Sequence, residues 1–172
     1  MPAAGRRQDG GVHAWLVGGA LIEGPEGLLL VQNRRRNGRV DWSPPGGVID
    51  EGEQLIEGLT REVEEETGLR VVRWEGPVYE VVADAPGLGW SLRVEVHRAV
   101  DYEGSLVVDD PDGIVVDAAW FDDDGCLGCL GDGHPWVREP LAAWIGERWQ
   151  GGRSFGFDVV GSDIATLSVS RR

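Results

Sequence analysis

Residues 47–69 read GVIDEGEQLIEGLTREVEEETGL, and this stretch decides the fold. Leu55, Leu59 and Val63 recur every four residues, so they predict an α-helix with one buried apolar stripe. Gly68 follows the last periodic residue, at the position where a helix commonly ends in a left-handed residue. The stretch therefore predicts a glycine-rich turn followed by an amphipathic helix.

Three carboxylates, those of Glu62, Glu65 and Glu66, are spaced at i, i+3 and i+4 along this helix. That spacing puts them at neighbouring positions on one exposed flank. Like charges this close repel each other, and Arg61 supplies only one positive charge. Hard oxygen ligands without Cys or His nearby favour Mg²⁺, or alternatively Mn²⁺, over Zn²⁺. The competing interpretation is a solvated acidic helix face, but the glycine turn and Arg61 favour the metal site.

The order of these residues resembles a complete Nudix box, the signature of hydrolases that cut nucleoside diphosphates linked to another moiety. Its fixed positions are Gly47, Glu53, Arg61, Glu62, Val63, Glu65, Glu66, Gly68 and Leu69. The preceding WSPPGG also resembles the family's usual approach to the box. Two residues depart from the common pattern. Gln54, near which the helix is predicted to begin, stands where Ser, Thr or Asp is frequent. Gly58 replaces a usual alanine at about 1 kcal/mol of helix propensity, so we expect it to pack closely against the sheet.

The rest of the chain alternates strand-like and helical segments. The predicted strands are 12–22 and 27–32, which suit a hairpin, then 71–83 with a bend at Gly76-Pro77, 90–96 and 114–121. A final helix is predicted over 134–149, where Pro140 either kinks the helix or delays its start. The resemblance implies an α/β fold, a Nudix-like α/β/α sandwich with a mixed β-sheet and a C-terminal β-rich tail.

We expect a flexible leader over residues 1–11, a Nudix hydrolase domain over 12–150 and a strand-like tail over 151–172. The alternating apolar residues of the tail predict strands that must pair to satisfy their backbone. They pair either with the sheet of their own domain or with a neighbouring copy in a homodimer.

The composition restricts the partners. A formal net charge of −14 over 172 residues argues against nucleic acid and against anionic membrane surfaces. No targeting segment is evident, and the longest apolar segment is too short to span a bilayer, so a cytoplasmic location is the default. Cys126 and Cys129 cannot form a disulfide scaffold. With His134 they could suggest zinc, but a fourth ligand is missing, and an incidental pair in a loop over 122–133 is favoured.

The resemblance implies a role for each box residue. The implied metal ligands are the carboxylates of Glu62, Glu65 and Glu66 and the carbonyl of Gly46. Glu53 would support the site, Arg61 would orient a neighbouring glutamate, and Glu65 is the first choice for the catalytic base. A further acidic ligand often comes from a late loop, for which the candidates are Asp109, Asp110, Asp112 and Asp117.

A phosphate-bearing substrate of an acidic protein needs local arginines. Arg34 and Arg35 lie in a basic run just before the box and are the candidates, the alternative being a solvated loop. Four aromatic residues could stack on a base or simply fill the core: Trp15, Trp74, Tyr79 and Trp90.

The compact size of the chain resembles that of family members that cut (deoxy)nucleoside triphosphates, including oxidised ones, to a monophosphate and pyrophosphate. ADP-ribose or another nucleotide sugar is the alternative substrate, since Pro86 lies close to where ADP-ribose hydrolases often carry a proline. A non-catalytic nucleotide sensor or a structural calcium site are further alternatives, but every carboxylate of the box is present.

Overall fold

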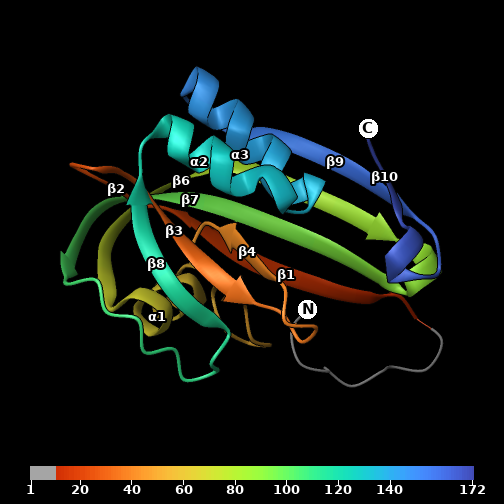
Figure 1. The fold of residues 1–172 in the computed structure, drawn as a ribbon, viewed down its shortest axis with the longest axis horizontal. Helices are drawn as coiled ribbons and strands as arrows, with labels where there is room; N and C mark the ends of the chain where they lie inside the picture. Colours follow the sequence, from red (N-terminus) through yellow and green to blue (C-terminus); the bar gives the residue numbers. More distant parts are fainter. Residues whose placement is uncertain (1–10) are drawn as a thin grey trace.

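The structure is a computed structural model that describes residues 11–172, so the expected leader lies, except for Gly11, outside the described residues. Two β-sheets are enclosed by helix α1 on one side and helices α2 and α3 on the other (Figure 1). This arrangement confirms the predicted α/β class.

The larger sheet has six strands in the order β10-β9-β6-β7-β1-β5. Their bounds are His13–Leu21 (β1), Gly46–Val48 (β5), Leu69–Ala85 (β6), Trp90–Gly104 (β7), Arg153–Val160 (β9) and Ser168–Arg171 (β10). The pairs β1–β7 and β6–β9 are parallel, whereas the other pairs are antiparallel. The sheet is therefore mixed, and the tail forms two of its strands.

The smaller sheet contains β2 (Glu23–Gly24), β3 (Gly27–Arg34), β4 (Val40–Ser43) and β8 (Val115–Phe121). The predicted hairpin between residues 12–22 and 27–32 is confined to its turn, where the Ile22 carbonyl accepts from the Leu29 N–H and β2 pairs with β3. Strand β1 itself does not pair with β3, which instead pairs with β4 and β8. Strand β1 already has β5 on one edge and β7 on the other, which satisfies its backbone groups.

Helix α1 (Leu55–Thr67) follows the extended residue Gln54, whose side chain makes no capping hydrogen bond, and ends at Gly68 with a φ of 74°. Leu59 and Val63 are fully buried. They pack on residues of β1, β3, β6 and β7 to form the smaller of two apolar cores. The periodicity and the helix-ending glycine thus predicted this helix correctly.

The predicted loop over 122–133 is wrong, since residues Asp123–Cys129 form helix α2. The Asp122 carboxylate caps this helix by accepting a hydrogen bond of 2.8 Å from the Gly125 N–H. Cys126 is fully buried in the larger core, which gives it a packing role. Short 3-10 turns lie at Pro86–Leu88 (η1), Leu130–Asp132 (η2) and Ile164–Thr166 (η3).

Helix α3 (Pro135–Glu147) begins at Pro135 and contains Pro140 in its interior, so the delayed start is wrong. Its apolar residues pack against both sheets in the larger core together with β9, which buries Phe155, Phe157 and Val159. Among the described residues, no helix is long and apolar enough to cross a bilayer.

Candidate functional site

Two glycines of β5 bring the backbone unusually close to its neighbours. Gly46 has a φ of +150°, and a Cβ there would lie 2.0 Å from the Gly18 carbonyl oxygen. A Cβ on Gly47 would lie 2.6 Å from a carboxylate oxygen of Glu62. Glycine is therefore required at Gly46, and at Gly47 the missing side chain leaves room for the carboxylate of Glu62.

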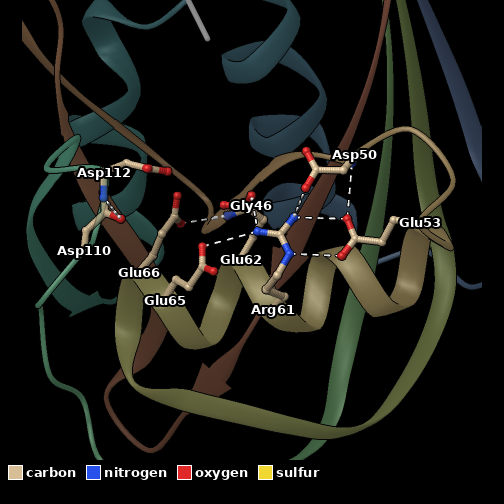
Figure 2. Close-up of polar contacts among 9 residues, drawn as sticks. All are labelled: Gly46, Asp50, Glu53, Arg61, Glu62, Glu65, Glu66, Asp110 and Asp112. Carbon is tan, nitrogen blue, oxygen red and sulfur yellow. Dashed lines mark hydrogen bonds and ion pairs between the residues drawn. The ribbon is translucent and has the colours of Figure 1, made fainter. Parts of the chain in front are cut away.

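The side chain of Glu66 points from α1 to this strand, and its Oε2 accepts a hydrogen bond of 3.0 Å from the Gly46 N–H (Figure 2). Glu66 is only 8% exposed, so the prediction of an exposed flank is wrong for this residue. Its burial comes from a contact with β5, which helical spacing alone does not reveal. Within residues 11–172, no cationic side chain forms an ion pair with Glu66.

Desolvation by burial raises the pKa of Glu66 to about 8, and the negative charges of Glu62, Asp110 and Glu65 add to this rise. Desolvation also raises the pKa of Glu62, although Arg61 acts in the opposite direction. These glutamates therefore form an electrostatically unfavourable group that binding of a cation would relieve.

Arg61 is the counter-ion of the neighbouring carboxylates. Its Nε and Nη2 donate to the two oxygens of Glu53 at 3.0 and 3.1 Å. Its Nη1 donates to Glu62 Oε1 at 2.9 Å and to Glu65 Oε2 at 3.3 Å. The hydrogen bond from Arg61 lowers the pKa of Glu53, and the pairing with Glu53 raises the pKa of Arg61 above its usual range. One guanidinium thus links three of the predicted residues, while Glu66 lies outside its reach.

The described groups do not form a ready-made cage, since no three carboxylate, imidazole or thiolate side chains in residues 11–172 converge as a metal-binding group. Their chemistry nevertheless fits a hard divalent cation. The side-chain groups beside Glu66 are carboxylates, and its own carboxylate is buried with no positive partner in the described part of the chain.

The late acidic loop lies beside these glutamates (Figure 2). The Asp110 carboxylate accepts hydrogen bonds from the backbone N–H groups of Asp112, Ile114 and Val115 at 2.9–3.2 Å. Asp112 is exposed and close enough to Glu62 to raise its pKa. Among the four candidates, Asp110 and Asp112 are therefore near the site. Asp109 is exposed, and Asp117 accepts from the adjacent Ala118 N–H within β8.

The two predicted phosphate-binding arginines have different surroundings. Arg35 forms a bidentate pair with Asp41, with N–O distances of 2.6 and 2.7 Å. Arg34 is exposed, and its backbone N–H donates to the Ile114 carbonyl beside the acidic loop. Arg35 is thus already occupied by a carboxylate, whereas the Arg34 guanidinium is exposed.

A shallow pocket that the sequence did not indicate lies beside the Arg35–Asp41 pair. It is lined by Arg35, Asp41, Trp42, Ser43, Gly133, His134 and Val137. Its residues come from the turn after β3, from β4 and from the start of α3 with the two residues before it, segments that only the folded chain brings together. By contrast, all four aromatic candidates make contacts within the molecule, and Trp15 packs on His13 with ring centroids 4.0 Å apart. Tyr79 is buried in the larger core, Trp90 packs on Trp136 and Trp74 bonds to Thr60 of α1.

A sequence model of the NUDIX domain matches residues 13–127. A MutT-like protein of Streptomyces ambofaciens is 42% identical over 60 residues, which are 35% of this chain and 37% of that protein. The human 8-oxo-dGDP phosphatase NUDT18 is 36% identical over 55 residues, 32% of this chain and 17% of that protein. The chain therefore matches less than two fifths of the length of either relative.

The fold also has solved counterparts. The crystal structure of a MutT NUDIX hydrolase from Burkholderia pseudomallei aligns with a TM-score of 0.58 and 26% identity. The alignment covers 66% of this chain and 86% of that one.

Proposed function

Because the chain belongs to the Nudix family of hydrolases, we propose that it cuts a (deoxy)nucleoside triphosphate, including oxidised ones, to a monophosphate and pyrophosphate in a Mg²⁺-dependent reaction. The observation that carries this proposal is Glu66, a buried carboxylate inside a complete Nudix box that has no positive partner among residues 11–172. A purely structural acidic helix face would not contain a buried carboxylate, because burying an unpaired charge costs free energy.

Glu62, Glu65, Glu66 and the Gly46 carbonyl are the groups that would hold Mg²⁺, with Mn²⁺ as the alternative. When bound, the metal supplies charge neutralisation of the diphosphate and a lowered pKa of the attacking water. The chain's own residues orient these groups. Gly46 fixes one oxygen of Glu66 through its N–H, and Arg61 fixes one oxygen each of Glu62 and Glu65.

Glu65 is the proposed base. Its side chain is 33% exposed, so water can reach it, and only its Oε2 bonds to Arg61. A carboxylate with one held and one available oxygen can take a proton from water while staying in position.

Asp112 is the proposed late acidic ligand. The oxygens of Asp110 are engaged by three backbone N–H groups, which makes that residue the organiser of the loop. Asp112 is exposed on the same loop, and its charge acts on Glu62.

The nucleoside is proposed to lie over the surface between β4 and α3, because the pocket there, of about 20 Å³, is too small to enclose a base. Ser43 of its wall is three residues from Gly46, a separation of at most about 11 Å. A nucleotide whose phosphates reach the carboxylates therefore has its base within reach of Trp42 and His134. The name of the human relative supports an oxidised guanine nucleotide as substrate.

The test is a comparison of kcat/KM for 8-oxo-dGTP, 8-oxo-dGDP, the ordinary triphosphates and ADP-ribose, with Mg²⁺ and with EDTA. We expect triphosphates to be preferred, with pyrophosphate released directly. A tenfold preference for ADP-ribose, about 1.4 kcal/mol of transition-state discrimination, would replace the triphosphate proposal by the alternative. Turnover that persists in EDTA would reject the metal-dependent mechanism.

A further inference from the structure

The acidic loop between β7 and β8 begins with a short segment, residues 105–107, that crosses the C-terminal end of α1 (Figure 1). The backbone N–H of Val107 donates a hydrogen bond of 2.8 Å to the carbonyl of Thr67, the last residue of the helix. Leu106 packs on the smaller core, to which α1 contributes, whereas the Val107 side chain is 58% exposed. The backbone of Val107, rather than its side chain, therefore attaches the loop to the helix.

Two glycines with positive φ make this crossing possible. Gly68 has a φ of 74°, and a Cβ there would lie 2.8 Å from the Ser105 carbonyl oxygen and 3.3 Å from the Val107 nitrogen. Gly104 has a φ of 98°, and a Cβ there would lie 2.7 Å from the Gly68 carbonyl oxygen. Gly68 thus does more than end the helix, because its missing side chain lets the segment approach the last turn of α1.

The acceptor of the Val107 hydrogen bond is held firmly. Thr67 is fully buried, and its hydroxyl donates to the Val63 carbonyl at 2.6 Å. Thr67 also directly follows Glu66 in the chain. A bond to its carbonyl therefore ties the loop to the helical turn that carries the glutamates of the box.

Beyond the crossing, the loop is ordered by its own contacts. The Asp110 carboxylate accepts three hydrogen bonds of 2.9–3.2 Å from backbone N–H groups within residues 112–115. Asp110 adds to the raised pKa of Glu66, and Asp112 adds to that of Glu62, so both aspartates lie near the box. Because the loop is fixed internally, its place relative to these glutamates depends on how it is attached to α1.

We propose that Val107 is a positioning residue for the reaction, because its N–H docks the acidic loop on the end of α1 and so holds Asp112 beside the glutamates of the box. The inference rests on the proposed function, in which Asp112 is the late acidic ligand. Asp110 orders the loop within itself, and Val107 fixes the whole loop against the helix that carries the other ligands.

Val107→Pro tests the docking, since proline lacks the N–H and puts a ring carbon where the hydrogen was. Residues 105–107 must then move away from the Thr67 carbonyl. We expect kcat to fall about tenfold or more, and the Mg²⁺ concentration for half-maximal activity to rise by a similar factor, as when a group that orients a metal ligand is lost. The matched control is Val107→Thr, which keeps the N–H and nearly the same shape. Both quantities should stay within about twofold of the wild type in this control.

A double-mutant cycle with Asp112→Asn shows whether Val107 acts through Asp112. Asp112→Asn should lower kcat clearly in the wild type but less than about twofold in the Val107→Pro background. An equal loss in both backgrounds would show that Val107 does not act through Asp112 and would overturn the proposal. A Val107→Pro variant with the kcat and Mg²⁺ requirement of the wild type would overturn it as well.

Circular dichroism melts show whether Val107→Pro folds. If it does not, Leu106→Ala takes its place in the cycle, because this change removes packing of the segment on the smaller core and keeps the Val107 N–H. Its loss of kcat should again shrink in the Asp112→Asn background. A loss of the same size in both backgrounds would overturn the proposal.

Amide hydrogen exchange without nucleotide tests the docking separately from the proposed function. The N–H of residue 107 should exchange slowly in the wild type and in Val107→Thr, because it is hydrogen-bonded to the helix. Rapid exchange would reject the docking even if the protein is an active hydrolase. Slow exchange in a protein that cuts none of the nucleotides would reject the proposed function and leave the docking intact.

Discussion

Replacing Glu66 by Gln tests the buried carboxylate directly. Glutamine keeps an oxygen for the Gly46 N–H but cannot ionise. In the metal-free protein the pKa of Glu66 is about 8, raised by desolvation from 4.5. Because the folded pKa lies above the unfolded one, this group's contribution to stability is fully present below pH 4.5. It is lost as the pH rises through 8.

The size of the effect follows from these two pKa values. Between pH 5 and pH 9, ionisation of Glu66 should lower the free energy of unfolding of the metal-free wild type by about 4 kcal/mol. Glu66→Gln should lack this loss and should therefore be the more stable protein at pH 9 in EDTA. Mg²⁺ should reverse the order, because it stabilises only a site with an ionised carboxylate. Turnover of the variant should fall by several orders of magnitude.

The assay is urea denaturation of both proteins at pH 5, 7 and 9, each in EDTA and in Mg²⁺. The difference between wild type and variant isolates Glu66 from other titrating groups, which are common to both. Parallel pH profiles of the two metal-free proteins would refute the burial argument. Equal stabilisation of both by Mg²⁺ would refute the assignment of Glu66 as a metal ligand.

Two further substitutions separate function from folding elsewhere. Asp112→Asn should lower kcat with little change in stability, whereas Asp110→Asn should cost about 1–3 kcal/mol of stability, because its carboxylate accepts three backbone hydrogen bonds. Thermal melts beside kcat would check this, and the reverse pattern would exchange the roles of the two residues. Truncation after Gly152 should cost about 5 kcal/mol or more, because it removes Phe155, Phe157 and Val159 from the core. A truncated chain that melts at the wild-type temperature would contradict that estimate.

Helix α1 was predicted well because its signals, the four-residue apolar period and Gly68, depend only on residues close together in the sequence. The burial of Glu66 could not be predicted in the same way, since it depends on Gly46, twenty residues earlier in the chain. Helix α2 was missed because Gly125 and Gly128 disfavour a helix. Tertiary packing of Cys126 and capping by Asp122 overcome this local preference.

Contacts between distant segments also explain why the sequence could not choose among the acidic ligands or the arginines of the site. The carboxylates of the late loop are alike in sequence, and only their hydrogen bonds distinguish Asp110 from Asp112. Arg35 was a sound phosphate-binding candidate by charge, but strand pairing between β3 and β4 brings Asp41 to it.

The geometry of Gly46 has an evolutionary consequence. Two independent constraints, a φ of +150° and the Gly18 carbonyl 2.0 Å from any Cβ, exclude every other residue there. Substitutions at residue 46 are therefore not tolerated. The hydrogen bond from its backbone N–H to Glu66 stays the same as the family diverges. The pocket lined by Trp42 and His134 is made of side chains without such a constraint. Under the proposed placement of the nucleoside, substitutions beside that pocket would change the substrate while Gly46 stays the same.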